Sequence, residues 1–144
     1  MTDAPRTFDA AGLRAADPSL VTYTHIIYGL HALSVLIGLT SPATVVGSFV
    51  FGLPSIIAVI MNYVRQSDAR GSFLESHFTW QIRTFWFALL WIVVAGIVSA
   101  PLVLLLGLGI LTFFVAAAAI GLWVVYRVAR GWLALRDGRA IGAA

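Results

Sequence analysis

The side chains of this chain with the greatest capacity for chemistry are its three histidines, His25, His31 and His77. Imidazole binds metals and haem and exchanges protons near neutral pH. The chain has no cysteine, which excludes disulfides, thiolate nucleophiles and cysteine-ligated zinc or iron–sulfur sites. His25 and His31 lie six positions apart, which places them about 120° from each other around a regular helix. They cannot coordinate one metal ion together, and the sequence predicts no metal site.

A haem held by two histidines would need ligands from two helices at similar depth. His31 lies about 16 Å beyond the start of its predicted helix, whereas His77 lies in a polar segment near the surface. The sequence therefore predicts no haem and no other cofactor. We expect a neutral His31 that bonds a serine, a tyrosine or a carbonyl of another helix, because a charge in the bilayer is costly. His25 and His31 form the candidate intramembrane polar site, and His25 and His77 could meet across the helices.

The composition is that of a membrane protein. Of 144 residues, 60% are hydrophobic and 10% are charged, whereas a soluble domain carries about 25% charged residues. The mean hydropathy is +0.96. The polar residues gather in the first twenty positions, a central stretch and the last fifteen. We therefore expect the apolar stretches between them to face lipid as α-helices.

The apolar stretches have room for four crossings of about 20 residues each. We predict an all-α membrane protein with four transmembrane helices arranged as two hairpins, at about 20–39, 43–64, 84–105 and 108–128. The cytoplasmic tails are then 1–19 and 131–144, on either side of a transmembrane domain at 20–130. Two alternatives stay open, namely a re-entrant segment within the first pair and one helix of about 45 residues in place of the second pair.

The positions of the charges predict the orientation of these spans. All nine basic residues are arginines, and they precede the first span, separate the second from the third, or lie at and after the end of the fourth. The tips of both predicted hairpins have none, and apart from Arg127 at the end of the fourth span no carboxylate or guanidinium lies within a span. Because positively charged short loops stay in the cytoplasm, both termini are expected on the cytoplasmic face of a bacterial inner (plasma) membrane.

The connection between the second and third spans carries the densest set of polar and aromatic side chains. Ser72 followed by Glu75 is a capping box, which predicts a helix beginning at Phe73. Apolar residues then recur at helical spacing beside a polar side, which is typical of an amphipathic helix in the headgroup region. We expect 65–83 to be an interfacial segment. It serves either as a membrane anchor alone or as a docking surface for a partner. The candidate interaction residues are Asp68, Arg70, Glu75, His77, Trp80, Gln81 and Arg83.

Small residues four positions apart predict close helix packing in lipid. The pairs are Ser48 with Gly52, Ala95 with Ser99, Gly96 with Ala100, and Ala117 with Gly121. They fit contacts within the bundle or a homodimer interface. Pro54 and Pro101 interrupt the second and third spans, so a bend at Pro54 is expected. Paired interruptions also occur at transport sites, although these two prolines lie at different depths.

Four stretches carry a resemblance to a known family, namely YGLHALS at Tyr28–Ser34, SPATVVGSFV after it, MNYVRQSDARG at Met61–Gly71 and LESHFTWQIRTFWF at Leu74–Phe87. They resemble a family of small bacterial inner-membrane proteins of unknown function, over about residues 22–135. That family is distantly similar to the channel component of the protein translocon in the chloroplast inner envelope. The resemblance implies a four-helix membrane bundle, and its most specific part is His77–Gln81. A protein-conducting activity would be an analogy of fold alone.

These features predict a membrane protein that is not an enzyme. The sequence offers no Ser-His-Asp order, no phosphate-binding loop and no paired carboxylates at membrane depth, so we expect no catalytic residues. The first hypothesis is a scaffold or accessory subunit whose cytoplasmic segment contacts a partner. The alternative is an oligomeric small transporter or a channel component of the protein-translocation type. The expected partners are the lipid bilayer and a membrane protein or further copies of the chain, with no nucleic acid.

Overall fold

The computed structural model describes residues 12–40, 45–103, 105 and 107–142, with the backbone alone for residues 39–40 and 45–51. Within these residues the chain is all-α, as predicted. Four α-helices and one short 3₁₀-helix follow one another: α1 (Pro18–Thr40), α2 (Val45–Arg65), η1 (Gln66–Ala69), α3 (Leu74–Val103) and α4 (Leu108–Arg136). The predicted tip at residues 41–42 lies outside the described residues.

The last two helices are longer than the predicted spans, with 30 residues in α3 and 29 in α4. α3 runs from Leu74 to Val103 without a break, so the separate interfacial helix predicted from the sequence does not form. Its residues are the first turns of α3, because their apolar side, including Leu74 and Phe78, is buried against the other helices. α4 continues to Arg136, which makes the first residues of the predicted tail helical.

Local hydrogen bonds set the starts of α1 and α3. At the start of α1, the Asp17 carboxylate accepts a hydrogen bond from the Ser19 amide at 2.8 Å, which lowers the pKa of Asp17. At the start of α3, the Glu75 carboxylate accepts a hydrogen bond from the Gly71 amide at 2.8 Å. In a capping box it would accept one from the Ser72 amide instead. The Ser72 hydroxyl donates to the Ala69 carbonyl at 2.7 Å. The two hydrogen bonds of the predicted capping box therefore do not form among these residues. α3 begins at Leu74, one residue after the predicted start at Phe73.

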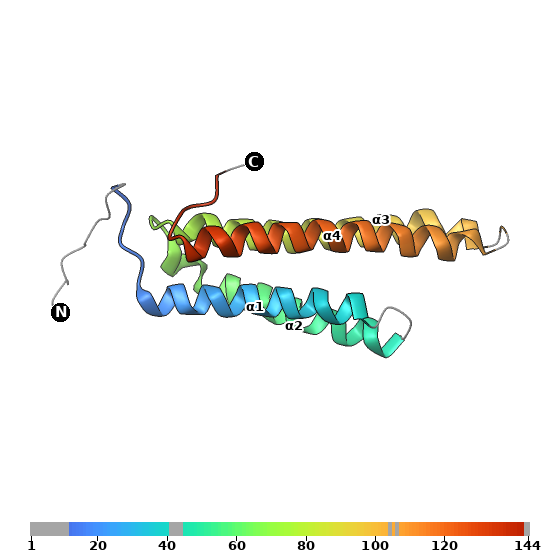
Figure 1. Ribbon diagram of the computed structural model, residues 1–144, viewed down its shortest axis with the longest axis horizontal. Helices are drawn as coiled ribbons and strands as arrows, with labels where there is room; N and C mark the ends of the chain where they lie inside the picture. The colour runs from blue at the N-terminus through green and yellow to red at the C-terminus, as the bar shows by residue number, and fades with distance from the viewer. Residues whose placement is uncertain (1–11, 41–44, 104, 106, 143–144) are drawn as a thin grey trace.

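The helices lie side by side along one long axis, α1 against α2 and α3 against α4, and α1 also packs on α4 (Figure 1). Four features share one end of the molecule: the start of α1, the connection from α2 through η1 to α3, the end of α4, and the C-terminal segment 137–142. We call this end the polar end. The apolar middles of the helices extend away from it.

A glycine turn returns the chain to α3 after α4 ends. Gly138 has a φ of 64°, in the left-handed region that favours glycine. The amide of Arg139 then donates to the Ala134 carbonyl at 2.9 Å, and that of Ile141 donates to the Ser76 hydroxyl at 2.9 Å. The C-terminal segment is thereby held against the first turns of α3.

The hydrophobic core lies near the polar end, where all four helices and η1 meet. Its largest members come from α1 and α3, with Tyr28 and Phe78 almost fully buried. Gly131 of α4 lies against Tyr28, and a methyl group on it would come within 2.7 Å of the ring carbon Cε1. The absence of a side chain at Gly131 is therefore what allows α4 to approach α1 this closely.

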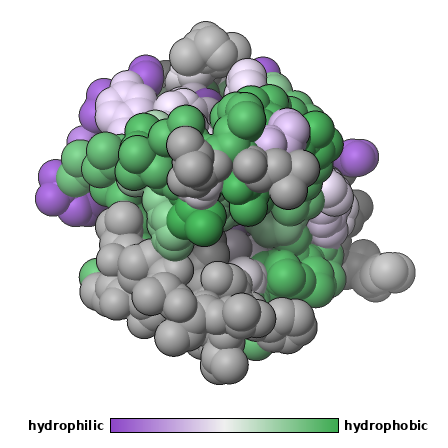
Figure 2. Space-filling view, turned by 90° about the vertical axis from the view of Figure 1, so that its right-hand side faces the viewer, coloured by the Kyte–Doolittle hydropathy of each residue, from purple (hydrophilic) through white to green (hydrophobic). Residues whose placement is uncertain are grey.

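At the opposite end, α3 and α4 touch through small residues. Gly109 is buried, and a methyl group there would meet the Ser99 carbonyl and lie 2.7 Å from Cγ2 of Val103. The Thr112 hydroxyl bonds the Ser99 hydroxyl at 3.3 Å. Ser99 belongs to a predicted small-residue pair, whereas Gly109 does not. Figure 2, which looks onto this end, shows mostly apolar described side chains, with polar ones behind them.

Most of the surface of α3 and α4 is apolar, with leucine, isoleucine, valine, phenylalanine and tryptophan side chains exposed. Such large apolar surfaces do not face water. Within the described residues, three helices are long and apolar enough to cross a membrane: Pro18–Gly38, Leu74–Val103 and Leu108–Arg136. The chain is therefore a helical membrane-embedded protein. Pro54 and Pro101 lie inside α2 and α3, and neither helix ends at its proline.

Candidate functional site at the polar end

The charged side chains of the described residues gather at the polar end, because residues 18–64 and 84–126 contain no Asp, Glu, Lys or Arg. Apart from His31, the indole, imidazole and phenol groups discussed below lie at the same end. They link helices that are distant in the sequence.

His77 of α3 is the centre of this network. It is fully buried, and its Nε2 lies 2.8 Å from the Arg139 carbonyl in the C-terminal segment. A carbonyl only accepts, so Nε2 carries a proton. In the neutral imidazole, Nδ1 then accepts from the hydroxyl of Tyr28 of α1, at 3.0 Å. One side chain thus ties α1, α3 and the C-terminal segment together.

Trp80 and Arg127 join α3 to α4. The Trp80 indole donates to the Arg127 carbonyl at 3.1 Å, while the Arg127 guanidinium carbon lies 3.6 Å from the centre of the Trp80 ring. Nε of Arg127 also donates to the Thr84 hydroxyl at 2.7 Å. A cation stacked on tryptophan gains electrostatic stabilisation from the ring. The guanidinium is therefore held in one orientation between the two helices.

His25 and Trp132 join α1 to α4 at the surface. The Trp132 indole donates to Nδ1 of His25 at 2.9 Å, and its ring stacks on Tyr28 with the centroids 6.4 Å apart. The sequence suggested that His25 and His77 could meet. In the structure no hydrogen bond joins them among the described residues, and both connect through Tyr28 and its neighbours.

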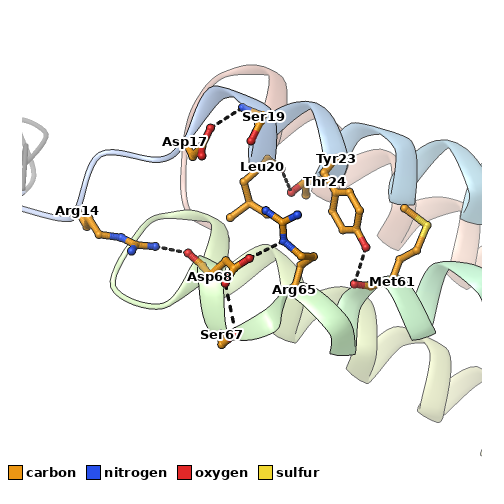
Figure 3. A network of polar contacts seen from close by, with 10 residues as sticks. All are labelled: Arg14, Asp17, Ser19, Leu20, Tyr23, Thr24, Met61, Arg65, Ser67 and Asp68. Atoms are coloured by element: carbon orange, nitrogen blue, oxygen red, sulfur yellow. Dashed lines mark hydrogen bonds and ion pairs between the residues drawn. The ribbon is translucent and has the colours of Figure 1, made fainter. Parts of the chain in front are cut away.

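The connection between α2 and α3 is fixed by a second polar network (Figure 3). Asp68 pairs with Arg65, and its carbonyl accepts from the Arg14 guanidinium. The Arg14 amide donates to the Gly71 carbonyl at 2.9 Å. One turn deeper, the Tyr23 hydroxyl donates to the Met61 carbonyl at 3.0 Å. The chain before α1 is therefore fastened to the connection.

The seven predicted interaction residues separate into two groups. His77, Trp80 and Gln81 are buried between the helices, so they cannot form a docking surface in this arrangement. The sequence does not distinguish these two situations, because a helix side that packs on other helices has the same apolar spacing as one that packs on headgroups. Asp68, Arg70, Glu75 and Arg83 are exposed at the polar end.

His31 lies far from this network, towards the middle of α1. Its Nδ1 lies 3.2 Å from the hydroxyl of Ser55 in α2, which confirms the predicted bond to a serine of another helix. Its Nε2 is buried and has no hydrogen-bond partner among the described residues. His25 is about two turns nearer the polar end and bonds Trp132 instead, so the two members of the predicted intramembrane site do not act together.

Two buried amides lie near the network. Asn62 and Gln81 are almost fully buried, and their side-chain atoms have no hydrogen-bond partner within the described part of the chain. Gln81 lies near the Tyr28 hydroxyl but forms no hydrogen bond with it. Buried amides without partners cost free energy, about 1–3 kcal/mol each. These polar groups are retained in the core at that cost.

Sequence reasoning missed Tyr28, Arg127 and Gly131, which are central to the network. Tyr28 lies in an apolar stretch and Gly131 follows Arg130 at the start of the predicted tail, and no local pattern links the two, although their contact joins α1 to α4. Arg127 follows the last apolar run directly, and its position there was the one available signal.

The Arg139 guanidinium, at the turn after α4, bonds Asp137 at 3.0 Å and lowers the pKa of that carboxyl.

No group of three or more His, Cys, Asp or Glu side chains that could hold a metal occurs among the described residues. In comparisons with known proteins, no family model matches the chain, and no curated protein and no solved structure is significantly similar to it. The resemblance drawn from the residues therefore stays a prediction.

Proposed function

We propose that the chain crosses a bacterial inner membrane four times, with α2 as the fourth span. α2 has 21 residues, which corresponds to about 31 Å, the thickness of the hydrocarbon layer. It contains no charged residue before Arg65 at its end. With four crossings the polar end lies on one face, and its arginines favour the cytoplasmic face. The helix pairs are then two hairpins whose tips point outward.

We propose further that the protein is a non-enzymatic scaffold or accessory subunit that binds a partner through its cytoplasmic face. The observation that carries this proposal is the fastening of the polar end. Hydrogen bonds hold the C-terminal segment against α3 and tie the connection between α2 and α3 to Arg14, while Arg70 and Glu75 stay exposed beside them. Such a rigid, charged surface is suited to recognition, because little conformational entropy is lost when it binds.

Crosslinking in the native membrane tests this proposal. The double variant Arg70→Ala/Glu75→Gln leaves the net charge unchanged, and glutamine keeps an oxygen for the Gly71 amide. We expect it to lose the crosslinked partner. The matched control is Arg136→Ala/Asp137→Asn, which removes another exposed pair at the same end. Identical partners for the wild type and the first variant would disprove the assigned surface.

An oligomeric transporter or channel component is the second candidate. The exposed apolar faces of α3 and α4 favour it, because further copies could pack there as well as lipid. The mass of the protein in nanodiscs and solute flux through liposomes separate the candidates. Stable oligomers with flux support the transporter, whereas a strict monomer without flux excludes it.

A further inference from the structure

A cavity of about 370 Å³ opens at the polar end, between the first turns of α3, the last turns of α4 and the C-terminal segment. Its lining includes Ser76, Thr79, Trp80, Arg83, Arg127 and Ile141. We call it the arginine pocket. Arg70 does not line it, whereas Glu75 belongs both to this pocket and to the docking surface proposed above.

The arginines at this pocket are close together. Arg127 is held by Trp80 and Thr84 as described, and its two terminal nitrogens bond no other residue within the described part of the chain. Arg83 and Arg130 both lie near enough to Arg127 for their charges to repel it. The guanidinium carbon of Arg130 is 5.6 Å from the centre of the Trp80 ring. Two guanidinium groups therefore lie over the Trp80 indole, and that of Arg83 lies near them.

No acidic residue in the described part of the chain forms an ion pair with Arg83, Arg127 or Arg130. Glu75 also lines the pocket, but one of its oxygens is bonded to the Gly71 amide. Two guanidinium groups line the pocket, with that of Arg130 close to Arg127, against one carboxylate, so the site is positive. A guanidinium binds phosphate oxygens through paired N–H donors, more specifically than an ammonium does.

The depth of the pocket in the proposed membrane is fixed by the apolar runs beside it. In α3 this run extends from Thr84 to Val103, about 20 residues or about 30 Å, which matches the hydrocarbon layer. In α4 it ends just before Arg127. Arg83 and Arg127 therefore lie at the level of the lipid phosphates. On the side of Arg83 that faces the apolar run, the centre of the exposed Phe87 ring lies 5.9 Å from the Arg83 guanidinium carbon. This apolar surface is suited to contact with acyl chains.

We propose that the arginine pocket binds the phosphate of an anionic phospholipid, with the headgroup in the cavity and the acyl chains along α3 and α4. The combination of a clustered charge, a cavity and adjoining apolar surface distinguishes this site from a general attraction to the membrane. Basic pockets between transmembrane helices bind anionic lipid headgroups in this way.

Native mass spectrometry of the delipidated protein, with equal amounts of phosphatidylglycerol and phosphatidylcholine added back, tests the proposal. We expect phosphatidylglycerol to be preferred, and Arg83→Gln to reduce that preference about fivefold, the effect of one arginine at a membrane surface. Arg83 is exposed and bonds no other residue among those described, so this variant should fold. Arg127→Gln should reduce the preference further, with circular dichroism to confirm its fold.

The matched control is Arg136→Gln, which removes one arginine at the same end but outside the pocket, and it should keep the preference. Equal binding of both lipids by the wild type, or an equal loss in the control, would overturn the proposal. Glycerol 3-phosphate supplies the phosphate without acyl chains. It should leave the bound lipid in place, and displacement at millimolar concentration would assign the site to a soluble phosphate instead.

Discussion

At the scale of single residues, the chain places its strongest polar contacts where its helices emerge from the apolar region. His77 is the best example, because both of its ring nitrogens have partners, one in α1 and one in the C-terminal segment. A buried imidazole with both nitrogens bonded has a fixed orientation. Its role is therefore structural in this arrangement, rather than that of a ligand or an exposed recognition residue.

Replacing His77 with phenylalanine tests that role. His77→Phe keeps a ring but removes both hydrogen bonds, and it leaves the Tyr28 hydroxyl and the Arg139 carbonyl unpaired. We expect a loss of about 1–3 kcal/mol in the free energy of unfolding and faster amide hydrogen exchange over residues 137–142. The control His25→Phe removes a more exposed bond and should leave that exchange unchanged. Unchanged exchange in His77→Phe would show that the segment is held by other contacts.

At the scale of elements, the contact between α1 and α4 depends on a glycine facing a tyrosine. A helical glycine costs up to about 1 kcal/mol relative to alanine, so its presence at residue 131 is explained by the space that Tyr28 occupies. α1 also contains Gly29, where an added methyl group would meet nothing within 4 Å. The two glycines therefore form a natural pair for comparison.

We expect Gly131→Ala to destabilise the protein by about 1–3 kcal/mol, because the methyl group forces α4 away from Tyr28. Gly29→Ala should be neutral or stabilising by up to about 1 kcal/mol. Chemical unfolding in detergent, followed by circular dichroism, measures both. The double variant Gly131→Ala/Tyr28→Ala should lose less than the two single effects added together. Equal behaviour of the two glycine variants would contradict the close packing of α1 and α4.

The sequence was sufficient to predict the helical class and the position of α1 to within two residues, because long apolar runs have a strong and local signal. It was insufficient for the packing of the first turns of α3, which continue directly into the apolar run of that helix. An amphipathic run between Leu74 and Arg83 has the same spacing whether its apolar side meets headgroups or other helices. The network around His77 depends on partners in α1 and in the C-terminal segment, which no local pattern links. The arginine pocket likewise needs Arg83 and Arg127 to be brought together by the fold.

At the scale of the whole molecule, the charged residues that the structure describes occupy one end, and the opposite end presents mostly apolar side chains (Figure 2). This one-sided distribution supports both proposals, since a partner and a lipid headgroup would each approach from the same side. α3 and α4 are longer than the hydrocarbon layer requires. Their excess length lies at the polar end, where it forms the walls of the arginine pocket.

We propose that the chain crosses the membrane four times with its polar end in the cytoplasm. Because it has no cysteine, single cysteines can report the side on which each position lies. The substitutions are Ser67→Cys and Gly142→Cys at the polar end, Leu105→Cys between α3 and α4, and Ser41→Cys after α1, which lies outside the described residues. Each is treated with a membrane-impermeant maleimide in right-side-out and in inverted vesicles.

The most direct readout is the side from which each cysteine reacts. We predict that positions 67 and 142 react only in inverted vesicles, and positions 41 and 105 only in right-side-out vesicles. Labelling of position 41 from the same side as position 67 would show that α2 does not cross the membrane, and it would contradict the account.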